Sequence, residues 1–497
     1  MAYKHGVYIS EEPTSVLPPV VADSAIPVFV GTAPLHLSQT GTLEDLDKKV
    51  NVPVLCYTYA EAVNTLGFIR DSSKWDDYTL SECIYSQFSL FGVAPAIFIN
   101  VLDPNNTAHK EDKAAAAMQV TNKAVNLGAN VIADTVTVKP SADGIALVAG
   151  TDYSVSYDSD GNCVVNVLED GSAAEATELY IGYTMLKPSA VDETDIIGGY
   201  DVQSGKYTGL EVVNQVYPKL QLITGSIVVP KFSQDSGVAA VMEAKAESVS
   251  GCYKAMALLD LDTSEEGAPT YSDAPELKNK LNFVNPLQIV PWGLGTLSEE
   301  KYYLSVLIAG LLGSTDNEWG NVPVKSPSNM VLPIDGLCNA AGEEINLTQE
   351  QANYLNGEGI VTAINLGGWK LWGNRTAAYP GSTDPKDTFI PVRRMFNWIG
   401  NTLITTWLQR VDYPIVQRTI ETIVDSINIW LNGLAAQEYL VGQPRVAFLE
   451  DENPTTNLMD GIVVLHVYIT PPSPMRELDF KLEYDVAQLQ TLFGSSE

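Results

Sequence analysis

Apolar residues recur along this chain in two patterns, and the first pattern predicts buried strands that alternate with helices. The run IPVFVG (26–31) predicts a buried strand ending at a glycine, and YTYAEAVNTLG (57–67) has helical spacing. The same order repeats once and ends in the apolar strand APAIFINVL (94–102). The second helix has one apolar stripe, formed by Leu80, Ile84 and Phe88. Alternating strands and helices are typical of an α/β layer.

A second pattern, with short alternating β runs, extends from about Asn130 to Pro188. Turn signals separate these runs, which predicts a small antiparallel β-domain inserted into the α/β body. The turn DSDG (158–161) differs from a calcium loop because its glycine comes too early and no glutamate occupies the twelfth position. We interpret this turn as part of a hairpin.

The α/β pattern returns with the strand GSIVVP (225–230), a helix over 237–251 and the strand AMALLDLD (255–262). Before them, GGYDVQSGKYTG (198–209) resembles a phosphate-binding loop. However, Tyr207 stands where that motif needs the serine or threonine that binds magnesium, and the glycine spacing is one residue too long. We therefore do not expect this loop to bind nucleotides.

The strongest helical signals lie in the last third of the chain. Two amphipathic helices are predicted over 389–410 and 413–434, because apolar residues recur there at helical spacing. Two alternating strands should follow, over 461–472 and 475–485. The second strand presents one apolar face, formed by Leu478, Phe480, Leu482 and Tyr484.

The stretch GGWKLWGNRT (367–376) suggests either a ligand-binding loop or a structural junction. Apolar residues precede the paired glycines and alternate with polar ones after them, which favours a strand, a turn and a strand. We interpret the stretch as a junction, in which Arg375 hydrogen-bonds backbone carbonyls or a carboxylate. The junction residues are Trp369, Trp372, Gly373, Asn374 and Arg375.

Composition narrows the possible functions. The chain has 497 residues, of which 45% are hydrophobic, enough for two to four domains. Its net charge of −32 would repel phosphate backbones, so we expect no direct nucleic-acid binding. No apolar run reaches eighteen residues, and the first residues do not resemble a signal peptide. We therefore expect a soluble protein made in a cytoplasm, with no membrane insertion.

Candidate catalytic and metal-binding groups are sparse. Four histidines lie apart without metal-ligand spacing, and no GxSxG motif is present. Five cysteines lie apart without CxxC spacing, and we interpret them as small buried apolar residues: Cys56, Cys83, Cys163, Cys252 and Cys338. We expect no enzymatic activity, no metal and no cofactor.

The first residues form a polar, β-prone run that Pro13, Pro18 and Pro19 interrupt. Such a segment has little to bury within one chain, which predicts an extended arm. Its central residues alternate and can add a strand to the sheet edge of another subunit. These residues are Gly6, Val7, Tyr8 and Ile9.

Several of these segments together resemble contractile tail sheath proteins of bacteriophages and phage-tail-like bacteriocins. WGNRT, PVRRMFNWI, WLNGL and the closing PPSPMRELDFKLEY resemble the C-terminal domain of that family. The start YKHGVYISEEPT with IPVFVGTAP resembles its N-terminal arm and first core strand, and TDIIGGYD with IVVP resembles its middle domain. The segments follow the family order along most of the chain.

The resemblance implies a multidomain α/β (α+β) fold with terminal arms that add strands to neighbouring subunits. It implies stacked hexameric rings around an inner tail tube, contracting from a metastable extended state to drive the tube through a cell envelope. Partners would be other copies of the chain, the tube protein, and baseplate and tail terminator proteins, in a virion or tailocin. The expected parts are an arm (1–22), a first α/β part (23–105), a middle α/β domain (106–129 and 189–365), an outward-facing β-domain (130–188) and a C-terminal domain (366–497).

Two alternatives remain at this point. One is another virion component, such as a baseplate or receptor-binding protein that uses the β-domain to bind a receptor. The other is a nucleotide-binding α/β enzyme that uses the loop 198–209.

Overall fold

The computed structural model describes residues 19–39, 42–203, 205–486 and 488–489. Its centre is an eight-stranded sheet with the order β19-β18-β14-β13-β12-β1-β3-β2. Strands from β18 to β3 run parallel, whereas β19 and β2 are antiparallel to their neighbours. The strands are β1 (Pro27–Gly31), β2 (Val54–Cys56), β3 (Ala96–Asn100), β12 (Ser226–Val228), β13 (Met256–Leu258), β14 (Gln288–Pro291), β18 (Ile360–Asn365) and β19 (Trp369–Trp372).

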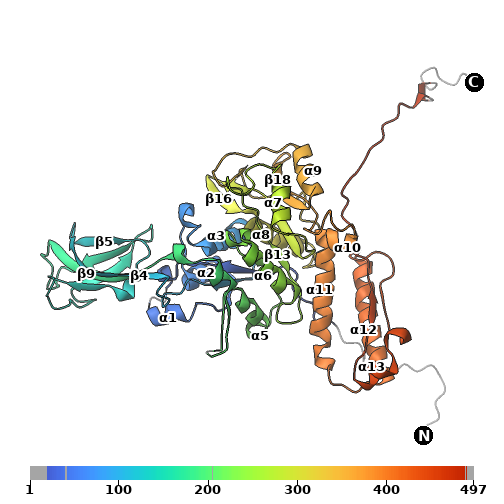
Figure 1. The fold of residues 1–497 in the computed structure, drawn as a ribbon, viewed down its shortest axis with the longest axis horizontal. Helices are drawn as coiled ribbons and strands as arrows, with labels where there is room; N and C mark the ends of the chain where they lie inside the picture. Colours follow the sequence, from blue (N-terminus) through green and yellow to red (C-terminus); the bar gives the residue numbers. More distant parts are fainter. Residues whose placement is uncertain (1–18, 40–41, 204, 487, 490–497) are drawn as a thin grey trace, which may run out of the picture.

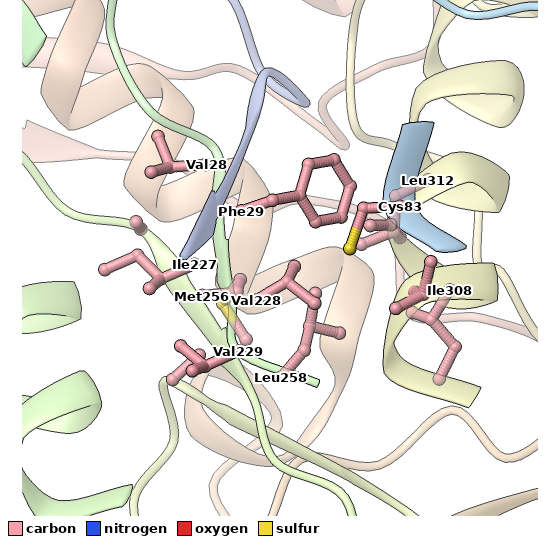
Figure 2. Packing of buried hydrophobic residues seen from close by; sticks show 14 of the residues in the cluster. Val28, Phe29, Cys83, Ile227, Val228, Val229, Met256, Leu258, Ile308 and Leu312 are labelled. Carbon is pink, nitrogen blue, oxygen red and sulfur yellow. The ribbon is translucent and has the colours of Figure 1, made fainter. Parts of the chain in front are cut away.

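Helices bury the inner strands of this sheet, and α3, α6 and α8 contact them directly. Figure 2 shows Phe29 of β1 near Cys83 of α3, with Ile308 of α8 across the same apolar cluster. Every residue of β1, β3, β12, β13 and β14 is buried, as expected for parallel strands covered on both faces. The helices of the body are α1 (Leu43–Asp47), α2 (Tyr59–Leu66), α3 (Thr79–Tyr85), α4 (Glu193–Ile197), α5 (Val216–Leu220), α6 (Ser236–Glu247), α7 (Ala274–Lys280), α8 (Leu304–Glu318), α9 (Gln349–Gly357) and α10 (Pro385–Thr388).

A second unit, which we call the β-insertion, lies at one end of the molecule in Figure 1. It consists of two three-stranded sheets, β4-β9-β6 and β5-β8-β7, around a hydrophobic cluster separate from that of the body. The predicted hairpin turn at 158–161 is confirmed, because it joins β7 to β8. The strands are β4 (Lys110–Gln119), β5 (Ala124–Gly128), β6 (Thr137–Lys139), β7 (Tyr153–Tyr157), β8 (Cys163–Val167) and β9 (Glu178–Leu186).

Strand pairing changes the expected domain boundaries. Residues 110–128, expected in the middle α/β domain, belong to the β-insertion because β4 pairs with β9 and β5 pairs with β8. The expected first α/β part and middle domain share one sheet, since β1 pairs with both β3 and β12. The expected boundary at 365/366 cuts the hairpin β18–β19, so β19 belongs to the central sheet rather than to a C-terminal domain.

The predicted C-terminal helices are confirmed as α11 (Ile390–Trp407) and α12 (Gln417–Ala436), which form an antiparallel hairpin beside the body in Figure 1. Their buried apolar residues belong to the same cluster as the central sheet. A small sheet of β20 (Arg445–Ala447) and β21 (His466–Tyr468) contacts α12, and α13 (Thr455–Met459) lies between these strands in the sequence.

Two further local expectations can be compared with the structure. The loop 198–209 contains an antiparallel hairpin of β10 (Gly199–Asp201) and β11 (Lys206–Thr208) and follows the helix α4 instead of a strand.

The expectation that all cysteines are buried is wrong for Cys252, which is exposed in the turn after α6. A remaining three-stranded sheet comprises β15 (Leu294–Leu297), β16 (Glu300–Tyr303) and β17 (Gly336–Cys338).

Among the described residues, no helix is both long and apolar enough to span a bilayer.

Candidate assembly interfaces

The chain after β21 forms an extension that leaves the body, as Figure 1 shows. The sequence predicts a strand here with one apolar face. Within residues 471–486 the structure assigns no strand, and the four apolar side chains are exposed. Their exposed fractions are 63% for Leu478, 76% for Phe480, 97% for Leu482 and 73% for Tyr484. Four large apolar residues at alternate positions mark a segment suited to pairing with another chain.

The small sheet β20–β21 offers an edge for such a segment. Val446 is held on the side facing α12, because its N–H donates to Asn428 Oδ1 at 2.7 Å and its carbonyl accepts from Asn428 Nδ2 at 3.4 Å. In an antiparallel pair, backbone groups of opposed residues alternate in direction. The N–H and carbonyl of its partner Val467 must therefore point away from β20, towards the outer edge of β21.

Side chains on this small sheet form a stacked group. The Arg445 guanidinium lies 4.1 Å from the ring centroid of Tyr468, whose ring is stacked on His466 with centroids 4.2 Å apart. His466 Nδ1 also lies 2.9 Å from Glu452 Oε1. These side-chain contacts hold the two strands together. They matter because an isolated two-stranded sheet is only marginally stable.

The strand, turn and strand predicted around 367–376 are confirmed by the hairpin β18–β19, and the role of this stretch as a junction stays a prediction. Trp369 and Trp372 lie in β19, and the Trp372 indole N–H donates to Asn353 Oδ1 at 2.9 Å. Gly373 has a φ of 138°, and a Cβ there would lie 3.0 Å from the Val361 backbone. Only glycine suits such a backbone position at such a close approach. Asn374 then accepts the N–H of Ile390 at its carbonyl, 3.0 Å away, which attaches the junction to the start of α11.

Arg375 differs from the expectation that it bonds a carbonyl or a carboxylate. Its Nη1 donates to Thr388 Oγ1 at 2.8 Å, and its guanidinium lies 3.8 Å from the Phe389 ring and 4.4 Å from the Tyr379 ring. Aromatic rings replace the expected anion because α10 brings Phe389 over this position. Burial lowers the pKa of Arg375.

A groove of about 780 Å³ lies between this junction and the base of the extension. Arg375 and Trp372 line one wall, and Pro472–Leu478 line another. The stretch 367–376 and the C-terminal extension, which the sequence predicts as two separate features, therefore lie next to each other in the structure.

The structure describes none of the predicted strand residues Gly6, Val7, Tyr8 and Ile9, which lie outside its described ranges. Sequence reasoning missed two contributors to this candidate assembly surface. The first is β20, a three-residue strand too short to give a periodic signal. The second is Asn428, a polar residue in the predicted apolar helix whose amide completes the small sheet.

Buried ionisable groups in the body have structural roles. Asp260 follows β13 and accepts from the Ser305 N–H at 3.0 Å and the Ser305 hydroxyl at 2.5 Å, which ties the strand to α8. Burial raises the pKa of Asp260 to about 6. Lys278 Nζ donates to the carbonyls of Glu358, Ala377 and Tyr379 at 2.8–3.0 Å, and burial lowers its pKa to about 8. Across the described ranges, no three histidine, cysteine or carboxylate side chains are grouped as metal ligands.

Comparison with known proteins identifies relatives along the whole chain. No family model matches the sequence. The tail sheath protein of Burkholderia phage BcepMu is 26% identical over 505 residues, which cover 99% of this chain and 99% of that protein. The tail sheath protein of Escherichia phage P2 is 27% identical over 58% of this chain and 70% of that protein.

Solved structures share the fold. The helical sheath of the anti-feeding prophage in its contracted state has a TM-score of 0.58 at 15% identity, covering 98% of this chain and 100% of that one. Sequence similarity to tail sheath proteins and a fold shared with solved sheath structures both extend over essentially the whole chain, so this chain is similar to contractile tail sheath proteins along nearly all of its residues.

Proposed function

We propose that this sheath subunit polymerises as stacked hexameric rings around an inner tail tube. The sheath contracts from a metastable extended state and drives the tube through the target cell envelope. It acts as part of a phage or tailocin particle, in contact with baseplate and tail terminator proteins. Its role is mechanical rather than enzymatic, so it needs no cofactor.

One observation carries this proposal: within the described part of the chain, the alternating segment 478–484 pairs with no strand, and β21 pairs on one side only, with β20. A segment from one copy can add a strand to the edge of another copy, which buries its four apolar side chains and pairs its backbone. The arm residues Val7 and Ile9 would add a further strand by the same chemistry. Such main-chain pairing tolerates rotation of subunits between two states, because flexible connections join each strand to its own body.

The β-insertion faces outward in this proposal. Most of its buried apolar residues form a cluster of their own, with only Ile132 and Leu186 packed in the cluster of the body, and its position at one end of the molecule leaves it clear of the C-terminal assembly surfaces.

The test is negative-stain microscopy of the purified full-length chain and of a chain ending at Pro472. We expect tubular polymers from the full chain and folded, unassembled subunits from the shortened one, with matching far-UV circular dichroism per residue for the described body. Tubes of normal length from the shortened chain would overturn the proposed strand exchange. Tight ATP binding by the full chain would instead revive the enzymatic alternative.

A further inference from the structure

The segment 20–24, immediately before β1, lies against one face of α11. The Val20 N–H donates to Thr406 Oγ1 at 3.0 Å, and the Ala22 N–H donates to Thr402 Oγ1 at 3.1 Å. The Trp398 indole N–H donates to the Ala22 carbonyl at 2.8 Å, and Arg394 Nη2 donates to the Ser24 carbonyl at 3.3 Å. The four helix residues Arg394, Trp398, Thr402 and Thr406 are spaced four apart, so they form a single row.

The spacing of this row matches the segment. Four helical residues rise about 6.0 Å and two residues of an extended chain rise about 6.6 Å. The amides of Val20 and Ala22 therefore reach Thr406 and Thr402, and the carbonyls of Ala22 and Ser24 reach the next two members of the row. Residue numbers increase along the segment as they decrease along the helix, so the two run antiparallel.

A buried ion pair fixes the other end of the row. Arg394 donates to Asp316 of α8 through Nη1–Oδ1 at 2.9 Å and Nη2–Oδ2 at 2.5 Å, and the two side chains are 3% and 2% exposed. The Ser24 hydroxyl donates to the same Asp316 Oδ2 at 2.5 Å. The segment, α11 and α8 therefore meet at one carboxylate.

We propose that this row of α11 is an anchor for the N-terminal arm, which transmits tension on the arm to α11 and α8 instead of β1. The inference rests on the proposed function, in which the arm is held by another subunit. Tension on an unanchored arm would act directly on β1, which begins three residues after Ser24 at the centre of the sheet. The row diverts that tension into α11 and, through Asp316, into α8, which packs across several strands. The anchor also sets the free length of the arm to the residues before Val20.

The test uses the full chain with Thr402→Val and Thr406→Val together. Valine keeps the size of threonine but removes the acceptors for the Val20 and Ala22 amides. Thr402→Ser with Thr406→Ser retains the hydroxyls. The matched control is Thr422→Val on α12, whose hydroxyl bonds only the Arg418 carbonyl of its own helix.

Two measurements are made: hydrogen exchange of the Val20 and Ala22 amides in the monomer, and the half-life of assembled tubes in dilute urea. In the double valine variant we expect both amides to lose protection and the tubes to disassemble about 25-fold faster, since each of the two hydrogen bonds contributes roughly a factor of five. The serine variant and Thr422→Val should stay within about twofold of wild type in both measurements.

Each outcome decides one part of the proposal. Unchanged amide protection in the double valine variant would overturn the row of hydrogen bonds. Lost protection with an unchanged tube half-life would overturn the mechanical role. Should the wild-type chain form no tubes, the proposed function fails, while the exchange measurement still tests the anchor on its own.

Discussion

The β-insertion and the α11–α12 hairpin both project from the central sheet, but they are attached to it in different ways. The insertion has a hydrophobic cluster of its own, whereas Ile390, Met395 and Trp398 of α11 belong to the cluster of the central sheet. The hairpin is also tied by the buried pair Arg394–Asp316. A unit with its own core can be lost without unfolding the body, while a unit that shares a core cannot.

The boundary between the insertion and the body combines the aliphatic packing of Ile132 and Leu186 with an aromatic contact. His36 of the body lies between Tyr78, with ring centroids 5.9 Å apart, and Tyr157 of β7, at 5.8 Å. The Tyr78 hydroxyl donates to Asn130 Oδ1 at 2.8 Å. Neither ring nitrogen of His36 has a hydrogen-bond partner among the described residues. The histidine therefore acts as a neutral aromatic spacer at this boundary.

The largest effect should come from Asp316→Ala, which leaves the Arg394 guanidinium buried without its anion. We expect the free energy of unfolding of the body to fall by about 3–5 kcal/mol, measured by urea denaturation of the monomer. Glu318→Ala, an exposed carboxylate two residues further along α8, is the matched control and should change it by less than about 0.5 kcal/mol. Equal effects of the two changes would mean that the ion pair does not join the hairpin to the body.

The second-largest effect is the pH dependence of the free energy of unfolding that His36 causes at the boundary of the insertion. Burial lowers the pKa of His36 from 6.5 to about 3, so below pH 6.5 the unfolded chain binds a proton that the folded chain does not. The free energy of unfolding therefore carries no penalty from His36 above pH 6.5. Below pH 6.5 it falls as pH falls towards 3, by roughly 2 kcal/mol at pH 5.

The control for this pH effect is His36→Phe, which keeps an aromatic ring between Tyr78 and Tyr157 but cannot titrate. The free energy of unfolding of both proteins is measured in urea at several pH values. Because the carboxylates are the same in both, the difference between the two proteins reports the titration of His36. A wild-type chain that loses no more stability than His36→Phe between pH 7 and pH 5 would contradict a neutral, buried His36.

A smaller effect on the body is expected when the insertion is removed. Lys110 and Leu186 are cross-strand partners, so a short Gly/Ser linker can join residues 109 and 187 without strain. We expect the body still to unfold cooperatively in urea, with its free energy of unfolding lowered by about 1–2 kcal/mol, because most of the insertion's core is a separate cluster and only Ile132 and Leu186 of the insertion pack in the cluster of the body. Aggregation or loss of cooperative unfolding would mean that the insertion completes the central core.

The smallest effect on the monomer should come from Leu482→Ser, because this side chain is 97% exposed. Monomer stability should stay within about 0.5 kcal/mol, whereas the concentration needed for tube formation should rise roughly tenfold or more, since burial of a leucine is lost at the interface. Lys481→Ser, on the opposite face of the same segment, is the control. An unchanged concentration threshold for Leu482→Ser would exclude this face from assembly.

The sequence alone determined the elements whose own residues carry a complete signal. The apolar runs of β1, β3, β12 and β13 specify buried parallel strands, and the helical spacing in α11 and α12 specifies both helices and their buried faces. The junction at Gly373 was also predictable, because glycine between two apolar stretches marks a backbone constraint. The alternation at 478–484 predicts a strand that the structure does not assign within 471–486, and its pairing with a second chain stays a proposal.

Tertiary structure decided the features that depend on distant partners. Residues 114–117 are four alanines, which favour a helix locally, yet they lie in β4 because β9 supplies the backbone partners. The attachment of segment 20–24 to α11 joins residues that are 370 to 386 positions apart. Local periodicity predicts which face of an element is buried. Which other element covers that face depends on long-range packing and hydrogen bonding, and a short stretch of sequence carries no information about these contacts.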